Sequence, residues 1–415
     1  MASSAISLHG PIGVQDNRNV LINGDFNLWQ RGVTVDWATN TIAGTAGGDY
    51  GYNKFVADRW RIYLDSKSSG VTAPSMTISR NLFDLGLPSG ADNASKWYLN
   101  VFVGPTAPTG GAHEGHNNVG GFTQSGAGAG YSADGSFAAL IQDIEDVRTL
   151  ENKTCTVSFW AKSDISNQRV APVLKQVFAA SSGSTIEGWL ISGSTGGLGH
   201  TLDNTWRKYQ TSFNVPSIEG QPQVGASGDH ALQLRLMLHA NSGKAGTGVK
   251  FELGGPAQAG KTGNISFAQV QLEQGSKVTE FDKKSPAQEI MECNRFYQKT
   301  YNPDVAPGTD NSAIEDLKWA GMNSLNYPVI NLDAISHYQF IPEMRTTPSI
   351  TLYDHAGNAN KTSHGDSTSN INVGVPFHIG HSGFNWGFEQ STRPSTIGIY
   401  YVHIVSDAEL SVTTT

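Results

Sequence analysis

Two segments of the sequence alternate aliphatic residues with polar or aromatic ones, a pattern typical of strands that turn one face to a core. In 231–239, ALQLRLMLH, leucine takes every second position, with Gln233, Arg235 and His239 between them. In 154–162, TCTVSFWAK, Trp160 lies on the face opposite the apolar residues. An aromatic ring can stack on the apolar side of a pyranose, while amide, guanidinium and imidazole groups bind hydroxyls. If both segments lie in one sheet, these four side chains are expected to line a glycan groove.

The same polar and aromatic faces also suit packing against protein. An exposed aromatic patch marks an interaction site without naming the partner. A neighbouring subunit, a second domain or the segment at 104–135 could cover these faces equally well. The sequence therefore leaves two interpretations open, structural packing and glycan binding.

Catalytic motifs are missing from the sequence. It contains no GxSxG, HExxH or Walker-type GxxxxGK[ST] pattern, and GAGAGY at 126–131 lacks a flanking strand and helix. We therefore predict no catalytic residues and a protein that is not an enzyme. Carboxylates that cleave glycans need not be close in sequence. A glycan depolymerase thus stays a weaker alternative, although the adjacent pair Glu145 and Asp146 suits a strand end entering a turn.

Charge, hydropathy and cysteine usage limit the partners and the compartment that can be expected for this protein. The net charge is −8 and lysine and arginine do not cluster, so no nucleic-acid partner is expected. No apolar run reaches the ~18 residues of a membrane span, so no membrane insertion is expected. The N-terminus lacks the features of a signal peptide. Cys155 and Cys293 are predicted to be buried free thiols in a protein that folds in a reducing cytosol.

Composition and turn signals favour an all-β fold. Only 15% of the residues are charged, and glycine occurs 47 times. Strand signals separated by turn residues recur through 19–285, which predicts a jelly roll or β-sandwich. The glycine-rich stretch at 104–135 is expected to be a long loop, and residues 1–18 an attachment arm that orders on a partner.

One helix is predicted between two β units. Ser285 suits the N-cap, Pro286 the first helical position, and Gln288 completes a capping box. Ile290, Cys293 and Tyr297 recur at helical spacing, which predicts a helix from about 286 to 299. Residues 286–300 then bridge to a smaller antiparallel β domain at 301–415.

An ordered set of motifs carries a family resemblance. The motifs are LINGDFNLWQRG at 21–32, ADRWRI at 57–62, TCTVSFWAKS at 154–163, FAQVQLEQG at 267–275 and ECNRFYQK at 292–299. Together they resemble the carbohydrate-binding-module-like jelly roll of tail fibres and other receptor-facing virion proteins of tailed bacteriophages. The resemblance covers about residues 19–300 and implies a homotrimer.

The resemblance also implies a structural calcium ion between the first and last strands of the jelly roll. The matching positions are Asn23, Asp25, Gln269 and Glu273. Calcium takes six to eight oxygen ligands, preferably with several carboxylates. Gln269 stands where an acidic residue is expected, and Asn23-Gly24 also suits a simple turn. No other cofactor is expected.

These inferences predict a virion structural protein, assembled in the host cytoplasm. The first expectation is a short trimeric tail fibre that binds host surface glycan during adsorption. Its arm at 1–18 would attach it to other virion proteins. The alternative is a connector, collar or head-fibre protein with no glycan ligand.

Overall fold

In the structure, a computed structural model, the regular secondary structure of the described residues is antiparallel β-sheet apart from one helix. The described residues are 18–37, 50–66, 71–72, 76–83, 95–103, 123–124, 137–178, 186–192, 199–219, 230–240, 262–310, 333–364, 367–372, 374–388 and 400–410. Within these ranges the only helix is α1 (Pro286–Asn294). The predicted all-β class is confirmed.

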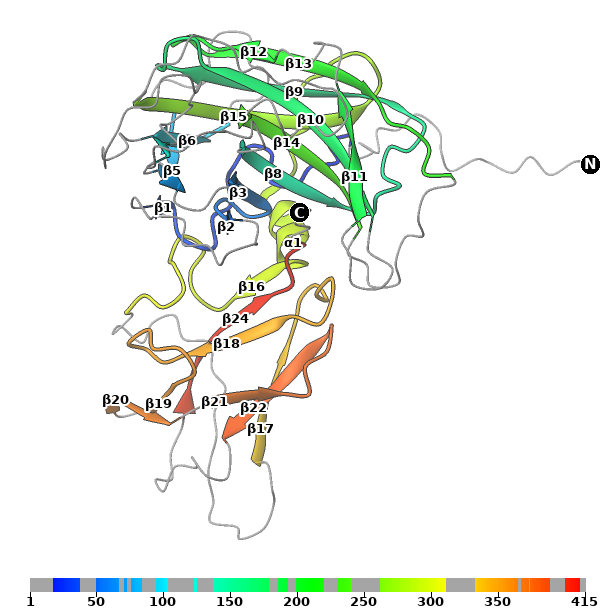
Figure 1. Cartoon of the computed structure of the whole chain (residues 1–415). Helices are drawn as coiled ribbons and strands as arrows, with labels where there is room; N and C mark the ends of the chain where they lie inside the picture. The colour runs from blue at the N-terminus through cyan, green and yellow to red at the C-terminus, as the bar shows by residue number, and fades with distance from the viewer. Residues whose placement is uncertain are drawn as a thin grey trace, which may run out of the picture.

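Two packed sheets form the jelly roll of the first unit (Figure 1). The six-stranded sheet contains, in spatial order, β1 (Thr34–Trp37), β5 (Met76–Leu82), β6 (Trp97–Val103), β15 (Gly263–Gln274), β9 (Thr154–Ser163) and β13 (Arg207–Asn214). The seven-stranded sheet contains, in spatial order, β11 (Ile186–Ser192), β10 (Arg169–Phe178), β14 (Ala231–Ala240), β8 (Phe137–Glu145), β3 (Trp60–Ser66) and β2 (Tyr50–Phe55). Its seventh strand, β12 (His200–Thr201), pairs with β10. The short strands β4 (Val71–Thr72) and β7 (Thr123–Gln124) pair separately.

The core between the two sheets follows the predicted alternation. The four leucines of β14 and the apolar face of β9 share one buried cluster with Trp29 and Trp60. Burying such side chains stabilises the fold by about 1.5–3 kcal/mol each. Trp29 is fully buried, so its role in the 21–32 motif is structural. Cys155 and Cys293 are both buried free thiols, as predicted, and burial raises the pKa of Cys155 to about 12.

The segment before β1 completes the jelly roll by lying along β15. Gly24 O accepts a hydrogen bond from Val270 N at 2.8 Å, and Val20 N donates to Leu272 O at 3.0 Å. A Cβ atom at Gly24 would lie only 2.2 Å from Val270 O. The glycine is therefore required by a close backbone approach rather than by an unusual φ angle.

Helix α1 begins as predicted but ends earlier. Ser285 Oγ accepts a hydrogen bond from Gln288 N at 3.2 Å, which confirms the N-cap. The helix ends at Asn294, and Tyr297 is instead the first residue of strand β16 (Tyr297–Lys299), which pairs with β24 (His403–Asp407). Ile290 is 40% exposed, whereas Glu289 and Cys293 are buried. The predicted helix end at about residue 299 was wrong, because this sheet pairing takes Tyr297 out of the helix.

Three small antiparallel sheets form the C-terminal unit (Figure 1). They are β16-β24-β18, β17-β22-β21 and β20-β19-β23. The remaining bounds are β17 (Asp333–Gln339), β18 (Ser349–Tyr353), β19 (Thr362–His364), β20 (Ser367–Asn372), β21 (Gly374–Phe377), β22 (Gly383–Phe388) and β23 (Tyr400–Tyr401). Their core includes Leu352, Phe384 and Trp386.

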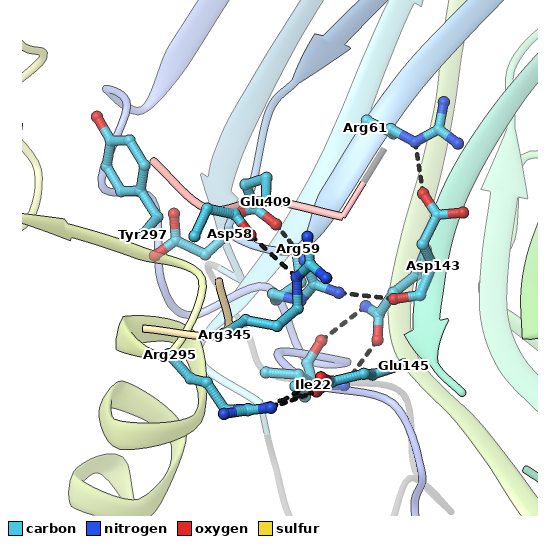
Figure 2. Close-up of polar contacts among 12 residues, drawn as sticks. Ile22, Asp58, Arg59, Arg61, Asp143, Glu145, Arg295, Tyr297, Arg345 and Glu409 are labelled. Carbon is cyan, nitrogen blue, oxygen red and sulfur yellow. Dashed lines mark hydrogen bonds and ion pairs between the residues drawn. The ribbon is translucent and has the colours of Figure 1, made fainter. Parts of the chain in front are cut away.

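Buried charges join the jelly roll to the C-terminal unit (Figure 2). Arg59 pairs with Glu409, and its Nη2 donates to the carbonyl of Asp143 at 2.6 Å. Arg31 Nη1 lies 3.3 Å from Glu409 Oε1, and the Arg31 guanidinium lies 3.6 Å from the ring centre of Tyr297. Because breaking these contacts would leave buried charges unpaired, they hold the two units in one arrangement.

Two predicted segments fall outside the described residues. They are the N-terminal arm, apart from Arg18, and the stretch at 104–135, apart from Thr123 and Gln124. In the part that the structure covers, no helix has the length and hydropathy that a membrane crossing needs.

Candidate functional site

The structure separates the predicted glycan-binding residues onto two sheets. Trp160 belongs to β9 of the six-stranded sheet, whereas Gln233, Arg235 and His239 belong to β14 of the seven-stranded sheet. The apolar faces of these strands meet in the shared core, so the opposite faces point away from each other. The prediction of a single groove from all four residues was wrong, since strand alternation fixes a face but not a sheet.

A polar row crosses the outer face of the seven-stranded sheet. Arg61 Nε donates to Asp143 Oδ2 at 2.8 Å, and Arg61 Nη1 donates to Asn53 Oδ1 at 3.0 Å. Gln233 Nε2 donates to Asp143 Oδ1 at 2.5 Å and Gln233 Oε1 accepts from Arg235 Nε. The row thus connects β2, β3, β8 and β14 through consecutive hydrogen bonds.

Four of the five side chains in this polar row are buried, and Asn53 at its β2 end is exposed. Gln233 is 0%, Arg61 1%, Asp143 2% and Arg235 8% exposed. The neighbouring side chains form a buried apolar cluster of Tyr63, Ala139, Ile141, Ala171, Val173 and Met237. The side chain of His239 lies outside the described part of the structure. The described portion of this face therefore has the properties of structural packing, which was the alternative interpretation of the sequence.

Aromatic side chains gather instead on the outer face of the six-stranded sheet. Tyr98 and Trp206 have ring centres 5.3 Å apart and meet edge to face at 79°. The ring centre of Phe83 lies 4.8 Å from that of Tyr98 and 5.3 Å from that of Trp206. The Lys162 ammonium lies 5.2 Å from the Trp206 ring centre and 5.9 Å from that of Tyr98. All four side chains are half-buried, so part of each remains accessible.

Amide and hydroxyl groups continue this surface along β5, β6 and β15. Asn81 Nδ2 lies 3.4 Å from the Tyr98 hydroxyl. Asn100 Nδ2 donates to Asn264 Oδ1 at 2.9 Å, and Asn100 Oδ1 accepts from Ser266 Oγ at 2.8 Å. We name this surface the aromatic face, which comprises Phe83, Tyr98, Lys162 and Trp206 with the flanking Asn81, Asn100, Asn264 and Ser266. Asn100 and Ser266 are buried, so the half-buried Asn81 and Asn264 supply the amides that can bind hydroxyls beside the rings.

Trp160 lies on the same side of β9 as Lys162 but is only 7% exposed. Its backbone pairs with Lys208 on β13 and Ala268 on β15, in the middle of the sheet. The ring is therefore in a position to support the aromatic face rather than to stack on a ligand. Of the four predicted residues, Trp160 alone belongs to the sheet that carries exposed aromatic rings.

Sequence reasoning missed the main residues of the aromatic face, although a signal was present. In β6, WYLNVFV, Tyr98 and Asn100 alternate with the buried Leu99 and Val101. The same alternation in 205–215 places Trp206 and Lys208 on one side. Comparing every strand for polar and aromatic alternation would have found them. Phe83 follows the end of β5 and has no such signal.

The predicted calcium positions have protein partners. Asn23 adopts a left-handed conformation (φ 55°), and its Oδ1 accepts from Leu28 N at 3.0 Å, so it forms a turn. Glu273 Oε1 accepts from Thr279 N at 2.9 Å, and Oε2 accepts from Thr279 Oγ1 at 2.6 Å. Asp25 is buried and accepts from the Asn27 side chain at 2.5 Å. Asn23 and Glu273 thus have local hydrogen-bonding roles, whereas Asp25 Oδ1 is buried without a hydrogen-bond partner.

The fourth calcium position, Gln269, is also buried and donates to Ser95 Oγ at 3.2 Å. Across the described ranges, no three His, Cys, Asp or Glu side chains form a group that could hold a metal ion. A calcium ion at Asn23, Asp25 and Glu273 stays a prediction.

Comparison with known proteins shows similarity of fold only. No protein-family model and no curated protein matches the chain. Among solved structures, a family 11 carbohydrate-binding module of a cellulosomal cellulase of Clostridium thermocellum is 11% identical, covers 56% of this chain and 99% of its own, and has a TM-score of 0.25. The tripod from the baseplate of bacteriophage Tuc2009 is 14% identical over 48% of this chain and 69% of its own, with a TM-score of 0.21.

A tandem CBM22 domain from Paenibacillus barcinonensis is 8% identical. It covers 90% of this chain and 93% of its own, with a TM-score of 0.22. Identities and scores this low leave the function to be inferred from the residues of this chain.

Proposed function

We propose that this protein is a structural protein of a tailed-phage virion, a short trimeric tail fibre that binds host surface glycan during adsorption. The aromatic face is the observation that carries the glycan part of the proposal. The virion part is supported by the ordered motifs between residues 21 and 299 and by their resemblance to receptor-facing phage proteins. The arm at 1–18 is the proposed attachment to other virion proteins.

The chemistry of the aromatic face suits a saccharide. Trp206 and Tyr98 meet edge to face, so they present two differently oriented ring surfaces on which pyranose rings can stack. The side-chain amide of Asn81 lies next to the Tyr98 hydroxyl and can donate to and accept from hydroxyls. Binding sites for small polar ligands combine apolar walls with a few placed polar groups in this way.

Two substitutions test the glycan site. Trp206→Ala and Tyr98→Ala should each weaken binding to host cells and to isolated host polysaccharide by at least about tenfold, as expected for central aromatic contacts. Met291→Ala is the matched control, because Met291 is a large exposed side chain on α1, away from the aromatic face. Thermal unfolding and oligomeric state should stay close to wild type, since both rings are half-exposed.

Three outcomes would contradict parts of the proposal. Normal cell binding by both aromatic variants would remove the aromatic face as the site. Incorporation into virions without binding to any host glycan would favour a connector, collar or head-fibre protein. Release of new reducing ends from the polysaccharide would favour a depolymerase, whereas we propose a protein without catalytic activity. A monomer in light-scattering measurements would contradict the trimer.

A further inference from the structure

Two lysines on the outer face of the six-stranded sheet have no carboxylate partner. Within the described residues, no Asp or Glu side chain lies within ion-pair distance of Lys162 or Lys208, whose Nζ is 3.4 Å from the Thr279 carbonyl. By contrast, Arg207 on the same strand pairs with Asp203 at 2.7 Å. Among the described residues, the positive charge of Lys162 and Lys208 on the aromatic face is therefore not balanced by an ion pair.

Two acidic side chains of this sheet, at β15 and just after β9, already have hydrogen-bond partners. Glu273 accepts three hydrogen bonds from Gln271 and Thr279. Asp164 accepts from the backbone and side chain of Asn264, at 2.5 and 2.8 Å. Since neither carboxylate pairs with Lys162, an anionic ligand would meet the ammonium group without displacing an existing ion pair.

The position of Lys162 places its charge directly beside the stacking rings. Its ammonium lies over Trp206 and Tyr98, and such cation–π contacts contribute about 0.5–1 kcal/mol at exposed sites. These contacts hold the ammonium close to both rings, so a sugar that stacks on the open part of either ring would lie beside it. A carboxylate attached directly to a ring carbon stays close to the stacked sugar ring, whereas a phosphodiester between sugar units lies farther from it.

We propose that the glycan bound by the aromatic face contains uronic-acid-type residues, and that Lys162 contacts their carboxylate. This inference rests on the proposed glycan function and adds the chemical class of the ligand. The Lys162 ammonium donates to a carboxylate oxygen while the sugar ring stacks on Trp206. Hydrogen bonds between charged groups are the stronger ones, so this contact selects acidic over neutral glycans.

The experiment compares acidic polysaccharides with their neutral counterparts. Uronic-acid-containing bacterial capsular polysaccharides are titrated against the full chain by calorimetry, each paired with its carboxyl-reduced form, in which the carboxylates have become hydroxymethyl groups. Reduction should weaken wild-type binding about tenfold. Lys162→Gln should remove the preference, so that the acidic and reduced polymers bind the variant with affinities that differ by less than about twofold. Lys153→Gln, an exposed lysine just before the same strand, is the control and should bind like wild type.

The possible results separate the inference from the proposed function. Equal wild-type affinity for the acidic and reduced polymers would overturn the inference and leave the glycan site standing, provided that Trp206→Ala weakens both. A phosphodiester-bearing polymer of the same charge density that bound as tightly as the acidic polysaccharide would show that the site accepts any oxyanion. That result would overturn the inference of a carboxylate ligand. Binding of no polymer in the panel would overturn both the inference and the proposed function.

Discussion

Arg59 and Glu409 pair across the junction between the two units, although they are 350 residues apart in the sequence. Only 1% of the Arg59 side chain and 3% of the Glu409 side chain are exposed. The Arg59 guanidinium also lies 3.4 Å from the ring centre of Phe296, just after α1. Arg59 thus contacts Asp143 on β8, Phe296 after α1 and Glu409 after β24. These contacts fix the position of the C-terminal unit relative to the jelly roll.

Glu409→Ala should lower the free energy of unfolding by about 3–5 kcal/mol, because it leaves the Arg59 and Arg31 charges buried without their shared carboxylate. Urea unfolding followed by tryptophan fluorescence measures the change. Glu343→Ala, at an exposed carboxylate of the C-terminal unit, is the control and should change stability by less than about 0.5 kcal/mol. A similar small effect of Glu409→Ala would show that the pair does not hold the junction.

Stability should fall as the pH rises from about 4.5 to 8, through the ionisation of Glu289. Burial, together with the nearby Asp25 carboxylate, raises the pKa of Glu289 from 4.5 to about 8. A raised folded-state pKa means that the protonated form is favoured in the fold, so its stabilisation is complete below about pH 4.5 and lost above about pH 8. Melting temperatures measured across this range should decline for wild type.

Glu289→Gln provides the internal comparison, since it keeps the size of the side chain and removes the ionisation. Its melting temperature should decline less than that of wild type over the same pH range and should exceed it at pH 8.5. Parallel curves for the two proteins would assign the pH dependence to other groups. Glu343→Gln should follow the wild-type curve, because Glu343 is exposed.

Gly24→Ala should destabilise the jelly roll by about 2 kcal/mol or more, because the added Cβ would lie 2.2 Å from Val270 O and force the two backbones apart. Hydrogen exchange should show loss of protection at Val20 and Val270, whose amides bridge the two segments. Gly380→Ala is the control, since its nearest neighbour would be an ordinary 3.7 Å away. Equal stability of the two variants would mean that the 19–24 segment can shift without cost.

Chelation should leave the melting temperature unchanged. Asn23 and Glu273 already accept hydrogen bonds from Leu28 and Thr279, so the oxygens of these two side chains are satisfied without an ion. Thermal unfolding in EDTA and in millimolar calcium tests this expectation. A melting temperature that rises with calcium, and a rise that is lost in Asp25→Asn, would establish the ion that the family resemblance implies.

Features encoded by neighbouring residues could be predicted from the sequence. The Ser285 N-cap depends on residues within three positions, and the inward leucines of β14 depend on a period of two. The fold class follows from many such local patterns taken together. These signals are strong because the chain must satisfy them whatever its tertiary neighbours are.

Features that depend on distant pairing could not be predicted in the same way. Nothing in the sequence near Trp160 or Gln233 indicates that β9 pairs with β15 while β14 pairs with β8. Tyr297 fits a helical pattern, yet its backbone pairs with Asp407, 110 residues later. The candidate site was misplaced for the same reason, since its residues converge only after the strands have been assigned to sheets.

Residues 403–410 supply the central strand of one small sheet and then reach the jelly roll, where Leu410 packs on Phe296 and Glu409 pairs with Arg59. Translation runs towards the C-terminus, so the jelly roll emerges from the ribosome before this segment has been synthesised. During that interval Arg59 and Phe296 lack the partners that bury them, which exposes an aggregation-prone surface. A premature stop before residue 403 should therefore yield an insoluble chain rather than a smaller stable jelly roll. The jelly roll can complete its fold only after residues 403–410 have been synthesised.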